Sequence, residues 1–138
     1  KLIINIFIMP ELAEVKIMSI IAKKKFSGSK LKNLEILYDK YKRKGMPKNY
    51  HKFKKALPLK IIDFNTKGKF LWITLENEWS IWIIPSMTGH LQPNPGVYNK
   101  VIFTTDKKGN FYFDNRLRRH YGTKFVGCLR FNLFFYII

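Results

Sequence analysis

Hydrophobic residues recur at helical spacing early in the chain. From residue 11 to about residue 25, apolar positions such as Val15, Met18 and Ala22 fall three or four residues apart, which predicts a helix. Acidic residues come early in this segment and lysines come late, in agreement with the preference of charges for the two ends of a helix. A Ser-Gly-Ser segment follows and ends the helix.

After residue 57 the pattern changes to alternation. Short runs rich in Ile, Phe and Trp are separated by turn-forming residues, and this period of two is typical of half-buried strands. The fold class that we predict is α+β, mostly β, with the N-terminal helix packed on an antiparallel β-sandwich. We expect strands near 31–37, 59–64, 69–76, 79–84, 100–105 and 110–114, a short helix near 50–56, and a loop at 86–96.

Composition adds a strong positive charge. The 138 residues include 26 Lys and Arg against 9 Asp and Glu, for a net charge of +17. Such an excess favours a polyanionic partner, nucleic acid first and an anionic membrane second. Lys, Ile, Asn, Phe and Tyr are all abundant and all have AT-rich codons, so part of the excess can reflect genome composition. The basic segment 38–55 is either a solvated linker or a nucleic-acid contact.

Metal, disulfide and membrane chemistry find little support in the sequence. Cys128 is the only cysteine, and His51, His90 and His120 show no ligand spacing with it. We therefore expect no cofactor and no metal site. No apolar run reaches the roughly 18–20 residues of a membrane span, so we expect no membrane partner.

Both ends of the chain differ from the middle, being apolar and without clear periodicity. We expect residues 1–8 to be an extension that is not native to the domain. Residues 9–126 would form the domain itself, and residues 127–138 a truncated or aberrant tail.

Four short segments occur in an order that resembles a known family. They are MPELAEV (9–15), KGKFLWITL (67–75), SMTGHL (86–91) and GNFYFDN…RHYG (109–122). Together they resemble the N-terminal catalytic domain of the formamidopyrimidine-DNA glycosylase/endonuclease VIII family of base-excision repair enzymes. The resemblance covers roughly the first half of a family member. We expect the helix-two-turns-helix and zinc-finger domains that follow in the family to be absent.

The resemblance implies that Pro10 is a nucleophile. In the family, removal of the first Met leaves proline at the N-terminus, and its secondary amine forms a Schiff base with the damaged nucleotide. A free α-amino group with a pKa of roughly 8 can act in this way. In the printed chain Pro10 follows Met9, so its nitrogen is an amide and is not nucleophilic. The plain alternative is a proline in the first turn of a helix.

The resemblance also implies roles for Glu11 and Lys69. Glu11 matches the general acid/base of the family, although an acid in the first turn of a helix is common for electrostatic reasons alone. Lys69 matches a lysine that contacts DNA phosphate and assists strand cleavage by elimination. A lysine in a turn is otherwise usually only solvated.

Three further residues match those that fill the gap left by a flipped nucleotide. Met87 matches the residue that enters the gap, and Arg119 and Tyr121 match the arginine and aromatic wedge of the family's RRFG-type loop. A methionine at a strand end is otherwise more often part of a core. The loop is one residue longer than the pattern, so the register of Arg118 against Arg119 stays open.

The implied function is DNA base-excision repair, in which oxidised bases are removed with AP-lyase strand cleavage, impaired here by the shortened chain. The implied partner is double-stranded DNA with an oxidised base or an abasic site. We expect a monomer that acts with DNA inside the cell, in a nucleus, nucleoid or viral factory. Two alternatives remain: a non-enzymatic remnant that binds nucleic acid by charge, and an unrelated basic domain that binds RNA or membranes. The lesion preference stays open.

Overall fold

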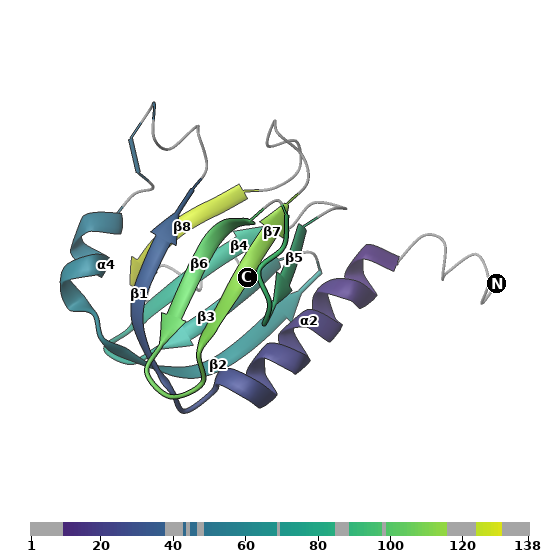
Figure 1. The fold of residues 1–138 in the computed structure, drawn as a ribbon, viewed down its shortest axis with the longest axis horizontal. Coiled ribbons are helices and arrows are strands. Elements are labelled where there is room, and N and C mark those ends of the chain that lie inside the picture. Colours follow the sequence, from purple (N-terminus) through teal and green to yellow (C-terminus); the bar gives the residue numbers. More distant parts are fainter. Residues whose placement is uncertain are drawn as a thin grey trace.

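The computed structural model describes residues 10–37, 43, 45–46, 49–68, 70–84, 89–97, 99–115 and 124–130. Within these ranges the chain forms the helices α2 (Pro10–Phe26) and α4 (Tyr50–Ala56) and one antiparallel sheet (Figure 1). The strands of the sheet are β1 (Lys30–Ile36), β2 (Leu59–Lys67), β3 (Phe70–Leu75), β4 (Trp79–Ile84), β5 (Gly89–Gln92), β6 (Asn99–Thr105), β7 (Asn110–Asn115) and β8 (Lys124–Arg130).

The sheet has the strand order β5-β7-β6-β1-β2-β3-β4-β8. Its centre is a short junction, because β1 and β2 pair only at Lys30 with Lys60 and at Leu31 with Leu59. On one side of this junction lie β5, β7, β6 and β1, and on the other lie β2, β3, β4 and β8. The sheet bends at the junction, so that the two halves face each other as the layers of a sandwich (Figure 1).

Alternating side chains build the core between the two layers. Leu71, Ile73 and Leu75 of β3 are buried, and the residues between them are partly exposed. The layers meet at the rings of Phe64 and Phe111, whose centroids are 5.8 Å apart. This arrangement follows from the period of two, which sends every second residue of a strand to the same face.

Helix α2 closes one side of the sandwich. Its buried residues Val15, Met18, Ala22 and Phe26 recur at helical spacing and belong to the same core as the strands. The helix ends at Phe26. Gly28 follows, and its positive φ of 90° allows the chain to turn; its N–H donates a hydrogen bond to the carbonyl of Ile61 at 2.8 Å.

Helix α4 lies on the other side of the molecule from α2 (Figure 1). Phe53 is fully buried, and its ring meets that of Trp79 edge-on at 5.5 Å. The hydroxyl of Tyr50 donates a hydrogen bond to the carbonyl of Leu34 at 2.9 Å. These contacts tie α4 to β1 and β4.

The predicted fold class is confirmed, with a helix followed by an antiparallel sandwich. The predicted loop at 86–96 was wrong in part, because Gly89–Gln92 form β5, which pairs with β7. Proline and glycine residues surround this short edge strand, and because they are typical of turns, the sequence pattern predicted a loop. Residues 127–130, which the sequence assigned to a tail, belong to β8 and pair with β4.

Candidate active site

The N-terminal end of α2 carries the first two candidate residues. The backbone of Pro10 opens the helix, and Glu11 follows in the same turn. Proline suits this position because the first residues of a helix need no N–H partner within the helix. Pro10, the candidate nucleophile, is therefore the first residue of a helix whose inner face is packed in the core.

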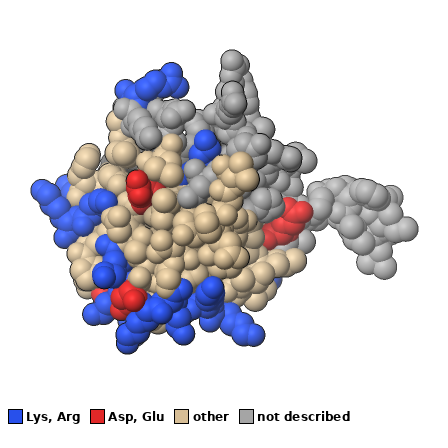
Figure 2. Space-filling model, in the orientation of Figure 1, with Lys and Arg blue, Asp and Glu red and all other residues tan. Residues whose placement is uncertain are grey.

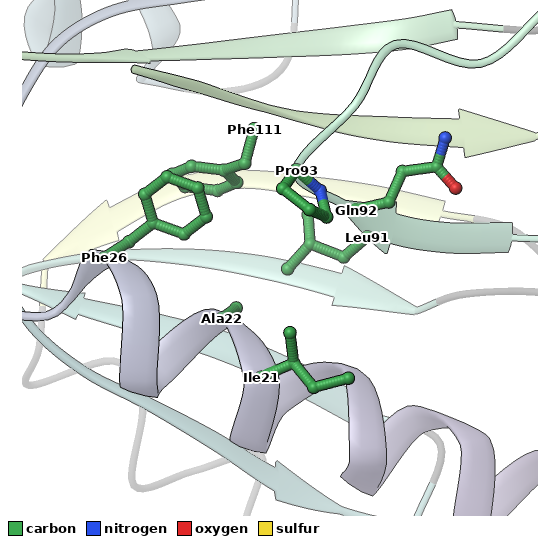
Figure 3. A pocket seen from close by; sticks show the side chains of 7 residues that line it. All are labelled: Ile21, Ala22, Phe26, Leu91, Gln92, Pro93 and Phe111. Carbon is green, nitrogen blue, oxygen red and sulfur yellow. The ribbon is translucent and has the colours of Figure 1, made fainter. Parts of the chain in front are cut away.

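Strand β5 shows which end of the sandwich Pro10 approaches. The N–H of Leu91 donates a hydrogen bond to Sδ of Met18 at 3.0 Å. Further along β5, Gln92 and Pro93 lie across from residues 21 and 22 of α2 (Figure 3). Strand and helix thus run in the same direction, and the Gly89 end of β5 points toward the Pro10 end of α2.

Strand pairing brings the other candidate segments toward the same end. Gly89 pairs with Asn115, and Ile84 pairs with Lys124. The connections 85–88 and 116–123 therefore begin and end at the same two strand pairs. One contains Met87, and the other contains Arg119 and Tyr121.

Lys69 belongs to the connection between β2 and β3. Leu71, early in β3, pairs with Ile83, late in β4, so this connection lies at the end of β4 from which 85–88 departs. Lys69, Met87, Arg119 and Tyr121 themselves lie outside the described residues. The structure therefore brings together the strand ends that flank them, without describing their side chains.

An aromatic cluster beside this end was not singled out from the sequence. Phe70, Trp72 and Trp82 lie on the face of the second layer that is turned away from the core. The ring of Phe70 lies 5.8 Å from that of Trp72 and 5.6 Å from that of Trp82. The indole N–H of Trp82 donates a hydrogen bond to Oγ of Ser80 at 2.8 Å. The alternation of β3 carries the only sequence signal for it, since Phe70 and Trp72 share one face.

One ion pair ties the flank of α2 to β2. Nζ of Lys23 lies 3.0 Å from Oδ1 of Asp63. Partial burial acts to raise the pKa of the Asp63 carboxyl, but hydrogen bonds from Lys23, Asn65 and the Phe64 N–H, with the charge of Lys23, outweigh it and lower that pKa. The Asp63 carboxyl is therefore ionised, and its ion pair with Lys23 stabilises the contact between α2 and β2.

A small apolar pocket lies between α2 and β5 (Figure 3). Its volume of about 10 Å³ is close to that of a single water site, which is too small for a nucleobase. We therefore interpret this pocket as a small gap in the packing between α2 and β5 and not as a binding site for the base. It is lined by Ile21, Ala22, Phe26, Leu91, Gln92, Pro93 and Phe111.

Ligands for a metal ion do not gather in the part of the chain that the structure describes. No three His, Cys, Asp or Glu side chains come close enough there to hold a metal ion together. The helices within those ranges include none with the length and apolar character of a bilayer span.

Comparisons with solved structures identify proteins that share this fold. The chain superimposes on the MutM (Fpg) protein of Thermus thermophilus with a TM-score of 0.63 and 21% identity, covering 79% of this chain and 38% of that one. Lactococcus lactis Fpg (MutM) in complex with DNA containing an oxidized pyrimidine gives a TM-score of 0.70 and 16% identity, covering 93% and 48%.

A second Lactococcus lactis Fpg structure, a complex with DNA containing an abasic site, gives a TM-score of 0.71 and 16% identity, covering 91% of this chain and 46% of that one. The chain thus spans less than half the length of these proteins. The comparison with curated protein sequences gave no significant match.

The family model for the formamidopyrimidine-DNA glycosylase N-terminal domain matches residues 9–121. This range begins at the residue before Pro10 and takes in the four segments on which the resemblance rests, apart from the final Gly122. The chain belongs to the formamidopyrimidine-DNA glycosylase N-terminal domain family.

Proposed function

We propose that this chain is the catalytic half of a DNA glycosylase with AP-lyase activity, acting in base-excision repair. Its substrate would be double-stranded DNA with an oxidised base or an abasic site. The protein would act as a monomer, inside the cell, at the place where the DNA is located. The observation that carries the proposal is the convergence of the Pro10 end of α2 with the Gly89–Asn115 and Ile84–Lys124 strand ends. Pro10 and Glu11 belong to that end of α2, the two strand pairs flank the segments of Met87, Arg119 and Tyr121, and the β2–β3 connection that contains Lys69 lies at the same end of β4.

The proposed chemistry begins with a free Pro10 nitrogen. This nitrogen forms a bond to C1′ of the damaged nucleotide while the bond from C1′ to the base breaks, and the base leaves with the electron pair and takes up a proton. The C1′–O4′ bond then opens, and Glu11 passes the amine proton to O4′. The product is an iminium that links Pro10 to the sugar.

The other candidate residues would hold the DNA. Lys69 would contact a phosphate beside the lesion and assist elimination. Met87, Arg119 and Tyr121 would occupy the gap left by the flipped nucleotide, which offsets part of the few kcal/mol that unstacking costs. In the printed sequence the nitrogen of Pro10 is bonded to Met9, so the chemistry requires a polypeptide that begins at Pro10.

Borohydride trapping tests this proposal. A polypeptide that begins at Pro10 is incubated with a duplex containing one abasic site, and sodium borohydride then reduces any iminium to a stable amine. We expect a covalent adduct of protein and DNA on a denaturing gel. Two controls should give much less adduct: the chain as printed, with its Pro10 amide, and the Glu11→Gln variant. A folded polypeptide that begins at Pro10 and yields no adduct would overturn the proposal.

The net charge of +17 favours one second candidate function, which is nucleic-acid binding by charge without catalysis. This candidate predicts binding that weakens steeply with salt and is equal for lesion-containing and undamaged duplexes. A reproducible preference for the lesion over matched undamaged DNA would exclude it.

A further inference from the structure

The end of the sandwich opposite the candidate active site collects lysines from segments that are distant in sequence. Lys24 and Lys25 belong to the last turn of α2, Lys30 opens β1, and Lys107 and Lys108 belong to the turn between β6 and β7. All five are exposed. We name this surface the basic end; Figure 2 shows Lys and Arg side chains gathered along the corresponding lower edge of the molecule.

Hydrogen bonds join the start of β1 to the turn between β6 and β7. The N–H of Lys30 donates to Oδ1 of Asp106 at 2.9 Å, and the N–H of Asp106 donates to the carbonyl of Lys30 at 3.0 Å. The N–H of Lys108 donates to Oγ1 of Thr105 at 3.2 Å. The lysines of the basic end therefore project from a fixed backbone, which lowers the ordering cost of a shared ligand.

One carboxylate lies within the basic end. The hydrogen bond from the N–H of Lys30 is the main reason why the pKa of Asp106 is lowered, with the charge of Lys107 adding to the effect. Asp106 is accordingly ionised at neutral pH. Its charge offsets one of the five lysines, so a clear positive excess remains.

The basic end is remote from the candidate active site. The β6–β7 turn and Asn115 lie at opposite ends of β7, roughly 17 Å apart at 3.4 Å per residue. Lys25 and Pro10 lie at opposite ends of α2, roughly 22 Å apart at 1.5 Å per residue. A straight stretch of duplex that contacts one end leaves the other end accessible.

We infer that the basic end is a second binding surface, and that its ligand is the phosphate backbone of double-stranded nucleic acid. Phosphate contacts need fixed cations and no apolar insertion. Large apolar side chains that are exposed in the described ranges lie at residues 17, 20, 21, 62 and 97, and Ile21 is one helical turn before Lys24 and Lys25. None of them belongs to the start of β1 or to the β6–β7 turn, so Lys30, Lys107 and Lys108 lack, within their own segments, the apolar anchors that strengthen binding to a lipid surface.

The test measures the salt dependence of binding to an undamaged fluorescent duplex by anisotropy, with the full chain. The Lys107→Gln/Lys108→Gln variant is compared with Lys52→Gln/Lys55→Gln, which removes the same charge from exposed positions of α4. For the first pair we expect the slope of log K against log salt to fall by up to about 1.8, at about 0.9 for each lost phosphate contact. For the second pair we expect less than half of that change.

Equal effects of the two variants would overturn the inference, because net charge alone would then explain the binding. It would also fail if binding to phosphatidylserine vesicles, rather than to the duplex, depended on Lys107 and Lys108. The Lys107→Arg/Lys108→Arg variant should restore the wild-type slope, and thermal melting of each variant verifies its fold. Because the duplex carries no lesion, this test remains valid even if no adduct forms at Pro10.

Discussion

The two faces of helix α2 have similar hydrophobicity and different surroundings. Val15 and Phe26, on the inner face, are 3% and 2% exposed, whereas Ile17 and Ile20, on the outer face, are 55% and 56% exposed. Apolar side chains lie on both faces of α2, although the helix also carries charged residues, and the strands cover only one face. Hydrophobicity therefore marks candidates for burial, and the position of the neighbouring strands selects among them.

This difference matters for function because α2 connects the two ends of the molecule. Pro10 and Glu11 lie at its first turn, and Lys24 and Lys25 at its last. The inner face fixes the helix against β2 and β5, so it determines where both sets of residues are presented. Substitutions on the two faces can test whether the inner face of α2 contributes more to stability than the outer face.

The largest effect should come from Phe26→Ala. Phe26 is buried, and its ring centroid lies 4.4 Å from that of Phe111. Loss of the ring should enlarge the adjacent pocket and lower the free energy of unfolding by about 3–5 kcal/mol. Urea denaturation measures this value. A loss below about 1 kcal/mol would mean that the inner face of α2 contributes far less than its burial indicates.

A smaller effect is expected for Met18→Leu, which keeps the side-chain volume and removes the sulfur acceptor. The N–H of Leu91 then loses its partner at 3.0 Å, and we expect a loss of about 1 kcal/mol in the free energy of unfolding. The control is Met46→Leu, a methionine that packs against the core from another segment. If both variants lose the same free energy, the sulfur contact has no specific role.

The α2–β2 ion pair should make a modest contribution that depends on pH. Because the pKa of Asp63 is lower in the folded chain than the ordinary value of 3.8, its contribution to stability is present above that ordinary value and is lost as pH falls through the folded pKa. Asp63→Asn should cost less than about 1 kcal/mol at pH 7 and should make the loss of stability on acidification below the ordinary pKa smaller. Denaturation at several pH values, with Glu78→Gln as control, measures this. An unchanged pH profile would contradict the assignment.

The smallest effect is expected on the outer face. Ile20→Gln should change the free energy of unfolding by no more than about 0.5 kcal/mol, since the side chain is already more than half exposed. The same urea titration gives this value. A loss above about 1 kcal/mol would break the comparison, because it would show that the outer face is covered in solution.

Local pattern was sufficient for most of the elements. The period of α2, the alternation in β3 and the two-residue turn at Asn77 and Glu78 are local properties of the chain. Both turn residues have positive φ, as a tight hairpin between β3 and β4 requires. The four family segments could also be read directly, and the match over residues 9–121 agrees with them.

The sequence by itself therefore determined the periodicities, the turns, the charge and the family. Only the tertiary structure decided which face of α2 is buried, that Gly89–Gln92 pair as an edge strand, and that Lys30 lies beside the turn that carries Lys107 and Lys108. The physical reason is that burial and strand pairing depend on partners that are distant along the chain. The type of a single residue does not indicate which distant residues it will contact in the folded chain.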